Sequence, residues 1–230
     1  MLADLLDLLF PRRCLGCNAP GAALCLSCRD AQVPLVAARA PIPIIAGSRY
    51  DGAVRAAILR YKERGRRDLV GPLSVLLSRA IGAALAEARP LDRCRPVLVG
   101  IPSNRKDAAA RGGDHVARLA RPAAVRSGTG LAPGVLTLVR AKRDSAGLDA
   151  RSRAENLAGA FAARAAKPAA AAIIVDDIVT TGATLREATR TLAEVGWPVL
   201  GAAVVAATPR RAAQGVSGIG IGSFPPAGLA

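Results

Sequence analysis

The sequence predicts an α/β fold in which helices cover both faces of a mostly parallel sheet. Three observations support this prediction. Short apolar runs alternate with stretches of helical periodicity, which is typical of βαβ units. Apolar residues make up 51% of the chain but aromatic residues only 3%, so the core is built from Ala, Val, Leu and Ile. A length of 230 residues suffices for one good-sized core with a small appendage.

The individual elements follow from apolar periodicity. Helices are predicted over 53–60, 69–88, 113–121 and 184–195, and strands over 97–102, 134–139, 171–175 and 199–207. The helix over 184–195 has the clearest pattern, because its apolar residues recur at helical spacing along one stripe. Gly196 supplies its end and Pro198 prevents its continuation.

We expect four segments along the chain. Residues 1–32 form a small cysteine-rich module, and 33–48 form a Pro-rich linker with an edge strand from Ile44. Residues 49–208 form the main α/β domain, and 209–230, rich in Gly, Pro and Ala, form a flexible tail.

Four of the five cysteines form two CxxC pairs, at Cys14 and Cys17 and at Cys25 and Cys28. Each pair can turn both sulfur atoms toward one tetrahedral ion, which favours a structural Zn²⁺ site. Disulfides or a redox pair are the alternatives. Disulfides conflict with a reducing compartment, and a redox CxxC normally opens a helix after a strand. Cys94 stands alone and is interpreted as a buried or incidental thiol.

The net charge indicates which classes of partner are favoured, and the N-terminal residues indicate the location of the protein. The net charge of +15 favours anionic partners, namely phosphorylated metabolites, nucleic acid or an acidic membrane surface, although a coding bias toward arginine also produces such an excess. The first ten residues carry two Asp and no basic residue, unlike a secretory signal. We expect no membrane span and a cytoplasmic location.

The stretch VDDIVTTGAT, residues 175–184, carries the chemistry. It follows a predicted strand and leads into a helix, so its unpaired N–H groups suit a phosphate. Asp176 and Asp177 can accept hydrogen bonds from sugar hydroxyls or hold a metal. The phosphate cradle comprises Thr180, Thr181, Gly182, Ala183 and Thr184. Together these groups match a ribose 5-phosphate.

Other nucleotide-binding loops fit this stretch less well. A Walker loop needs a Lys after its glycine, and a Rossmann turn needs three spaced glycines. The alternative without function is a strand-to-helix turn with Thr caps. That alternative explains single residues but leaves the whole arrangement unexplained.

VDDIVTTGAT resembles the binding signature of type I phosphoribosyltransferases for phosphoribosyl diphosphate (PRPP). The wider chain resembles the ComF family, phosphoribosyltransferase-like proteins linked to DNA uptake and competence. The resemblance spans residues 14 to about 208 and includes the double CxxC, YDGAVRAAILRYKERG, GIPSNRKDAAARGG and ARSRAENLAGAF. It implies a type I phosphoribosyltransferase-like sheet with an N-terminal zinc module, PRPP binding with Mg²⁺, and competence-machinery proteins as partners.

The resemblance also implies residue roles and shows two departures. Asp176 and Asp177 would hold the ribose hydroxyls, residues 180–184 the 5-phosphate, and 140–155 the flexible catalytic hood. The diphosphate would meet Arg105, Lys106 and Arg111. Where the family tends to read RGFNQ, this chain reads RGGDH at 111–115, and the Gln that the family usually carries in its basic loop is missing at 143–148. Any contact that the family makes through these amide side chains is therefore not expected here.

Basic clusters elsewhere are candidates for single-stranded DNA binding. They comprise Lys62, Arg66, Arg67, Lys142 and Arg143. Few aromatic residues accompany them, so we expect salt-sensitive contacts to the DNA backbone rather than base reading. His115, the sole histidine, is interpreted as a packed or surface residue rather than a catalyst.

Two classes of function remain. The first is an enzyme that transfers the phosphoribosyl group of PRPP to an unknown nitrogen acceptor, with no obvious general base in the sequence. The second is a non-catalytic protein that keeps the PRPP fold and binds single-stranded DNA or a protein partner. A weaker third possibility is an interaction module that only borrows the fold.

Overall fold

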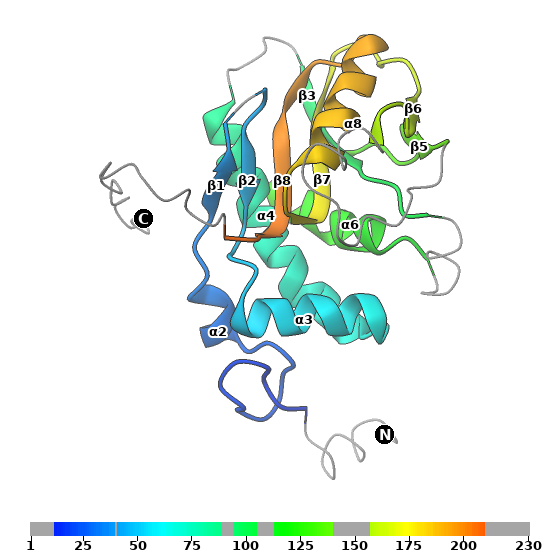
Figure 1. Cartoon of the computed structure of the whole chain (residues 1–230). Coiled ribbons are helices and arrows are strands. Elements are labelled where there is room, and N and C mark those ends of the chain that lie inside the picture. The colour runs from blue at the N-terminus through cyan, green and yellow to red at the C-terminus, as the bar shows by residue number, and fades with distance from the viewer. Residues whose placement is uncertain (1–11, 40, 89–93, 105–112, 140–156, 210–230) are drawn as a thin grey trace, which may run out of the picture.

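A six-stranded sheet forms the centre of the protein (Figure 1). The computed structural model describes residues 12–39, 41–88, 94–104, 113–139 and 157–209. The strand order is β1 (Leu35–Ala38), β2 (Ile44–Ala46), β8 (Val199–Ala207), β7 (Ala170–Val179), β3 (Arg95–Gly100) and β4 (Gly130–Leu131). Only β1 is antiparallel to its neighbour, and the other pairings are parallel. The mostly parallel sheet confirms the predicted fold class.

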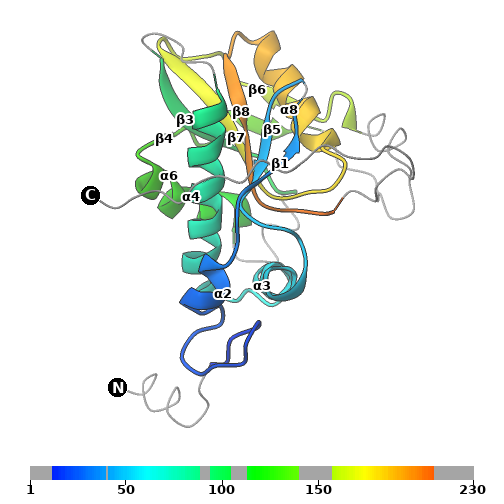
Figure 2. The same ribbon diagram turned by 90° about the vertical axis from the view of Figure 1, so that its left-hand side faces the viewer.

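Helices cover the two faces of the sheet unequally (Figure 2). One face is covered by α3 (Gly52–Glu63), α4 (Val70–Glu87) and α6 (His115–Ser127), with a short 3₁₀ turn at Arg67–Leu69 before α4. The other face is covered by α8 (Ala183–Glu194) and by a small antiparallel sheet of β5 (Leu136–Leu138) and β6 (Phe161–Ala163). The short helix α2 (Leu26–Asp30) belongs to the N-terminal module and lies beside α3, near the lower end of α4 (Figure 1). Two apolar cores result, one on each face.

Small residues allow the layers to approach closely. The central strands β7 and β8 are buried over nearly their whole length, as apolar runs in parallel sheets require. After β2, a Cβ added to Gly47 would lie 2.1 Å from the carbonyl oxygen of Leu76 in α4. Only glycine fits there, so this residue sets the distance between α4 and the sheet.

Several predicted elements differ from the structure. The segment predicted as a linker contains β1, and the strand from Ile44, predicted at the edge, lies between β1 and β8. The strand predicted over 134–139 appears as β5 and pairs with β6 outside the main sheet. These differences depend on pairing between distant segments, which periodicity does not reveal.

The helix predicted to end at residue 121 continues as α6 to Ser127, with Pro122 inside it. Burial of Ala123 and Ala124 together with Val116 and Leu119 in the core offsets the hydrogen bond that proline cannot donate.

Among the described residues, one helix is long and apolar enough to cross a membrane by length and composition alone. This helix, Arg67–Glu87, has 21 residues and contains an 18-residue window with a mean hydropathy of 1.7. In the structure this helix packs on the sheet and on α6 and buries Leu73, Leu76, Leu77 and Ile81. Its apolar composition is accounted for by these contacts with the core.

Candidate functional site

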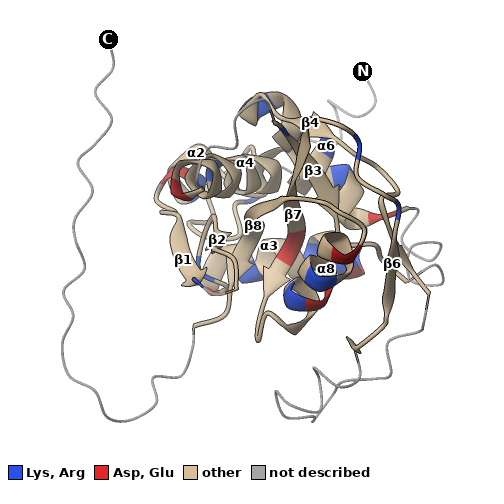
Figure 3. Cartoon of the chain, turned by 90° about the horizontal axis from the view of Figure 1, so that it is seen from above, with Lys and Arg blue, Asp and Glu red and all other residues tan. Residues whose placement is uncertain are grey.

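The two carboxylates of β7 have different surroundings. Strand β7 runs past both residues to Val179, so Asp176 and Asp177 lie within the last part of the strand rather than after it. Strand β7 itself lies in the middle of the sheet, between β8 and β3 (Figure 3). Adjacent side chains of a strand point to opposite faces. Asp176 is half-buried and lines a hollow beside the loop that follows β7, whereas Asp177 is only 4% exposed. The sequence analysis predicted that both carboxylates bind the sugar or a metal. In the structure the two side chains have different surroundings.

Asp177 is held by two nitrogen atoms from two helices. Lys62 Nζ of α3 lies 2.6 Å from Asp177 Oδ2, and His115 Nε2 of α6 lies 3.0 Å from the same atom. Both are close nitrogen–oxygen contacts, and neither meets the geometry of a hydrogen bond. Burial opposes the carboxylate, but the two partners outweigh burial and hold the pKa of Asp177 below its usual value. Asp177 is therefore a buried anion that ties α3 and α6 to the sheet.

His115 joins this contact to the end of β3. Its Nδ1 lies 2.9 Å from Ser103 Oγ, and its backbone carbonyl accepts a 2.7 Å hydrogen bond from the Tyr61 hydroxyl. The sequence analysis interpreted His115 as a packed or surface residue, and the structure shows it packed, at 8% exposed. That analysis did not single out Ser103. The available signal was a sole histidine at the start of an amphipathic helix, but its partners come from elements 12 or more residues away.

Asp114 is the N-cap residue of α6 and also connects this helix to the segment after β3. Its Oδ1 accepts hydrogen bonds from the backbone N–H groups of Val116 and Ala117, as in an N-cap. Its Oδ2 accepts a 3.0 Å hydrogen bond from the N–H of Ser103. Residues 113–115, where the sequence departs from the RGFNQ pattern, thus position α6 against β3 and β7.

The loop after β7 leads directly into α8. Gly182 adopts a φ of 75°, a left-handed conformation that favours glycine, directly before α8. Arg186 Nη1 donates a 2.9 Å hydrogen bond to the carbonyl oxygen of Thr181 and so holds the loop from the first turn of the helix. The sequence analysis did not single out Arg186.

All five residues predicted for the phosphate cradle line one hollow. Its volume is about 40 Å³, and it lies between Asp176 and the N-terminus of α8. The lining includes Thr180, Thr181, Gly182, Ala183 and Thr184 together with Asp176. A helix N-terminus supplies unpaired N–H groups and a positive dipole, so an anion is favoured in this hollow. A carboxylate on its rim suits a ligand with hydroxyls beside its phosphate.

The four cysteines of the CxxC pairs form one cluster. Their sulfur atoms all lie within 4.8 Å of one another, and Cys17 and Cys25 are 3.6 Å apart. A tetrahedral Zn²⁺ with Zn–S bonds of about 2.3 Å needs sulfur separations of about 3.8 Å, so the cluster fits such an ion. We conclude that these residues can hold zinc.

The protonation of the cluster also favours a cation. Burial opposes the thiolate of Cys14, but backbone N–H groups, among them those of Cys25 and Gly16, outweigh it and lower the pKa of Cys14 to about 6. Hydrogen bonds among the neighbouring cysteines raise the pKa of Cys28 to about 12. Cys14 therefore loses its proton readily, whereas loss of a proton from Cys28 is disfavoured. A divalent ion bound to the sulfur atoms would favour the thiolate of both residues.

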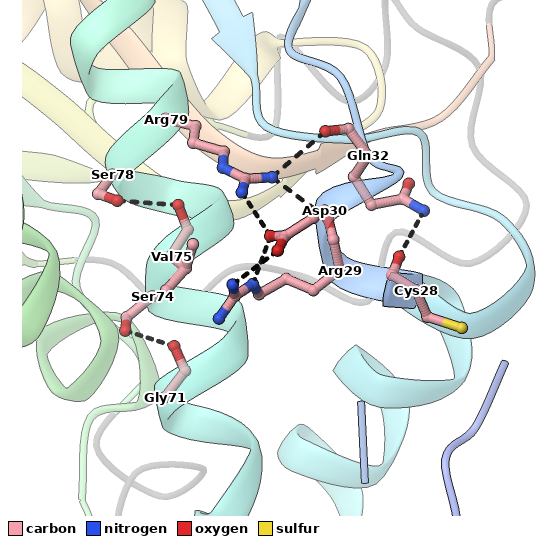
Figure 4. A network of polar contacts seen from close by, with 9 residues as sticks. All are labelled: Cys28, Arg29, Asp30, Gln32, Gly71, Ser74, Val75, Ser78 and Arg79. Carbon is pink, nitrogen blue, oxygen red and sulfur yellow. Dashed lines mark hydrogen bonds and ion pairs between the residues drawn. The ribbon is translucent and has the colours of Figure 1, made fainter. Parts of the chain in front are cut away.

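The cysteine module is fastened to the main domain by one arginine of α4 (Figure 4). Arg79 Nη2 lies 2.5 Å from Asp30 Oδ1, and Arg79 Nη1 donates to the carbonyl oxygens of Arg29 and Gln32. The loop of the module also lies against α3, since a Cβ on Gly16 would be 2.7 Å from Cys28 Sγ and 3.1 Å from Ala53 Cβ. The module is thus held by both α3 and α4.

The remaining predicted basic residues divide into three groups. Arg105, Lys106, Arg111, Lys142 and Arg143 lie outside the described residues. Lys62 and Arg66 are engaged in ion pairs, with Asp177 and with Asp68 respectively. Arg67 is exposed at the start of the 3₁₀ turn.

Comparison with known proteins identifies the domain. Residues 79–216 match the phosphoribosyl transferase domain family. The match covers more than half of the chain and includes β7, the following loop and α8, so the chain belongs to this family. The cysteine cluster lies before the matched region. A comparison with curated proteins gives no match.

Proposed function

We propose that this protein binds PRPP together with Mg²⁺ and transfers its phosphoribosyl group to a nitrogen acceptor. The observation that carries the proposal is the hollow that Asp176 shares with residues 180–184, on a domain of the phosphoribosyl transferase family. The hollow offers anion-binding N–H groups on one side and a carboxylate on the other. A ribose 5-phosphate presents the complementary groups in the same order.

Each residue of the hollow has a distinct part in binding. The N–H groups at the start of α8 and the hydroxyls of Thr180, Thr181 and Thr184 bind the 5-phosphate. Asp176 accepts hydrogen bonds from ribose hydroxyls. Asp177, the second carboxylate of the predicted pair, contributes by fixing β7 against α3 and α6, because Lys62 and His115 occupy its Oδ2. The protein contributes to this reaction by positioning the two reactants and by stabilising the charge of the leaving group.

The diphosphate side of the site belongs to the segment after β3. Arg105, Lys106 and Arg111 follow this strand in the sequence and would bind the diphosphate through charge-assisted hydrogen bonds. Bound Mg²⁺ would neutralise part of the diphosphate charge and so make it a better leaving group. These roles, like membership of the ComF family, a link to DNA uptake and a cytoplasmic location, rest on the sequence motifs.

A role in binding single-stranded DNA has less support than transfer. Two of its five candidate cations, Lys62 and Arg66, already have acidic partners. Binding through such residues would have to break existing ion pairs. We therefore place PRPP chemistry first and assign the zinc cluster a structural role at the base of α3 and α4.

Calorimetric titration with PRPP and Mg²⁺ tests the proposal. Asp176→Asn removes the carboxylate from the hollow and should weaken binding at least tenfold, a loss of about 1.4 kcal/mol. Glu194→Gln is the matched control, because Glu194 is 59% exposed at the far end of α8. Absence of binding by the wild type, or equal affinities for wild type and Asp176→Asn, would refute the ribose-phosphate assignment.

A further inference from the structure

Glu187 is a buried carboxylate that the proposed function does not yet use. Among the residues that the structure describes, Asp177 and Glu187 are the two acidic residues whose side chains are buried. Glu187 projects from the second turn of α8, the helix whose first turn lines the hollow. A charged group is seldom buried unless it is paired, so the partners of Glu187 indicate its role.

Glu187 contacts a segment that is distant in the sequence, Leu157–Ala160. Its Oε1 accepts a 2.7 Å hydrogen bond from the backbone N–H of Gly159. Arg190 donates from Nε to Oε2 at 2.9 Å and from Nη2 to Oε1 at 2.8 Å, which fixes the orientation of the carboxylate. The hydrogen bonds from Arg190, together with that from Gly159, outweigh burial and hold the pKa of Glu187 below its usual value. Glu187 is therefore an oriented anionic acceptor for this segment.

An apolar contact joins the same segment to the lining of the hollow. Leu157, Ala160 and Ala183 form a small buried cluster, against which Leu138 packs. Ala183 is the first residue of α8 and lines the hollow. Ala183 and Glu187 are four residues apart and so lie on one flank of the helix. The segment thus meets α8 twice, once at the hollow and once a turn beyond it.

The segment is itself fixed to the small sheet. The N–H of Ala160 donates a 3.0 Å hydrogen bond to the carbonyl oxygen of Leu157 and closes a turn. The carbonyl oxygen of Ala160 accepts a 2.9 Å hydrogen bond from the N–H of Val139, the residue after β5. Strand β6 begins directly afterwards at Phe161. The contacts of Glu187 and Ala183 therefore tie α8 to a fixed part of the fold.

This connection complements the packing of α8 on the main sheet. The helix buries Leu185, Ala188 and Leu192 in the core of that face. Apolar burial has no preferred direction, so this stripe holds the helix on the sheet but restrains its rotation only weakly. A hydrogen bond requires a defined distance and angle, so the bond between Gly159 and Glu187 fixes the rotation.

We propose that Glu187 is a positioning residue of the ribose-phosphate site, an inference that rests on the proposed function. By holding the segment against α8, Glu187 keeps the N–H groups at the start of the helix directed into the hollow, where the 5-phosphate binds. Glu187 does not line the hollow and acts through the helix. A helix without this restraint must be ordered when the ligand binds, and that ordering lowers the affinity.

Hydrogen–deuterium exchange of the full-length, ligand-free protein tests the contact itself. Glu187→Ala removes the acceptor of the Gly159 N–H, so this amide should exchange at least about tenfold faster than in the wild type. Glu187→Gln keeps an oxygen that can accept the bond, so its exchange should resemble that of the wild type. Equal exchange in the wild type and Glu187→Ala would overturn the inference, whatever the protein binds.

Calorimetric titration with PRPP and Mg²⁺ tests the consequence for the site. Glu187→Ala should bind about tenfold more weakly, and Glu187→Gln should recover most of the affinity. Thr191→Val is the matched control, because Thr191 is buried one turn further along the same flank. Its hydroxyl donates to the carbonyl oxygen of Glu187 within the helix, so its loss should lower stability and leave the affinity unchanged.

The other outcomes of the titration count against the inference. Equal affinities of the wild type and Glu187→Ala would overturn the positioning role and leave the PRPP site in place. A similar loss in Thr191→Val, or no recovery in Glu187→Gln, would show a general loss of stability and overturn it as well. Failure of the wild type to bind PRPP would refute the proposed function and the positioning role with it, while the exchange data would still report the contact.

Discussion

Lys62 Nζ lies 2.6 Å from Asp177 Oδ2, and this ion pair joins the last turn of α3 to the central strand β7. Lys62 belongs to a basic cluster that the sequence connected with nucleic acid, and Asp177 to a pair that it connected with ribose. Their contact makes both residues part of the framework that holds the site. The first prediction follows from this ion pair.

Asp177→Asn should destabilise the protein by about 3 kcal/mol, because it leaves the Lys62 ammonium and the His115 N–H without their buried anion. The free energy of unfolding from chemical denaturation measures this change. Asp176→Asn is the matched control, since Asp176 is half-buried and faces the loop hollow. Equal losses of stability in the two variants would contradict the separation of the pair.

Acid should remove the stabilisation that Asp177 provides. The folded-state pKa of Asp177 lies below its unfolded value of about 3.9, so its contribution is fully present above that value and is lost as pH falls toward the folded pKa. The stability difference between wild type and Asp177→Asn should therefore be constant near neutral pH and shrink below about pH 4. A difference that grew toward acid would have the wrong sign.

Gly182→Ala should weaken PRPP binding more than it weakens the fold. The left-handed φ of 75° costs a residue with a side chain about 1–2 kcal/mol, and the new Cβ would lie 3.2 Å from Arg186 Nη1. We expect the loop to shift and the affinity for PRPP to fall, as measured by calorimetry. Gly82→Ala on α4 is the control: its Cβ meets nothing within 4 Å, so stability should rise slightly and affinity stay constant.

The purified protein should contain about one zinc ion per chain, since the four sulfur atoms form a single cluster. Elemental analysis measures the ratio, and Cys17→Ser should lower it. Treatment with a chelator should expose the segment 12–32 to protease before the main domain unfolds. Folded wild-type protein that holds no zinc after expression with ample metal would contradict the site.

Arg79→Met should loosen the cysteine module from α4 while the α/β core remains intact. The change removes the contacts of the guanidinium with Asp30 and with the carbonyl oxygens of Arg29 and Gln32. Because these groups are partly exposed, we expect only a small loss of stability in the docking of the module. Limited proteolysis of residues 12–32 reports this loss, and Arg126→Met on the exposed face of α6 is the control. Equal cleavage rates would show that the contacts with α3 suffice.

The sequence by itself determined the class of fold and the run of residues that lines the hollow for which we propose a phosphate ligand. Apolar runs alternating with helical stripes predict a parallel sheet, because such runs must be buried on both faces. The cradle was predictable for a local reason: 180–184 are consecutive residues, and one turn between a strand and a helix places them around one hollow. The cysteine cluster was predictable on the same ground, because each CxxC pair brings its sulfur atoms together locally.

Only the tertiary structure decided what lies behind that cradle. Asp177 meets Lys62 and His115 across separations of 115 and 62 residues, and strand pairing and helix packing bring them together. The same holds for β1, which the sequence presented as a linker and which becomes a strand by pairing with β2. Local periodicity reports which face of an element is apolar. It carries no information on which distant polar group that element meets, because this depends on how the layers pack.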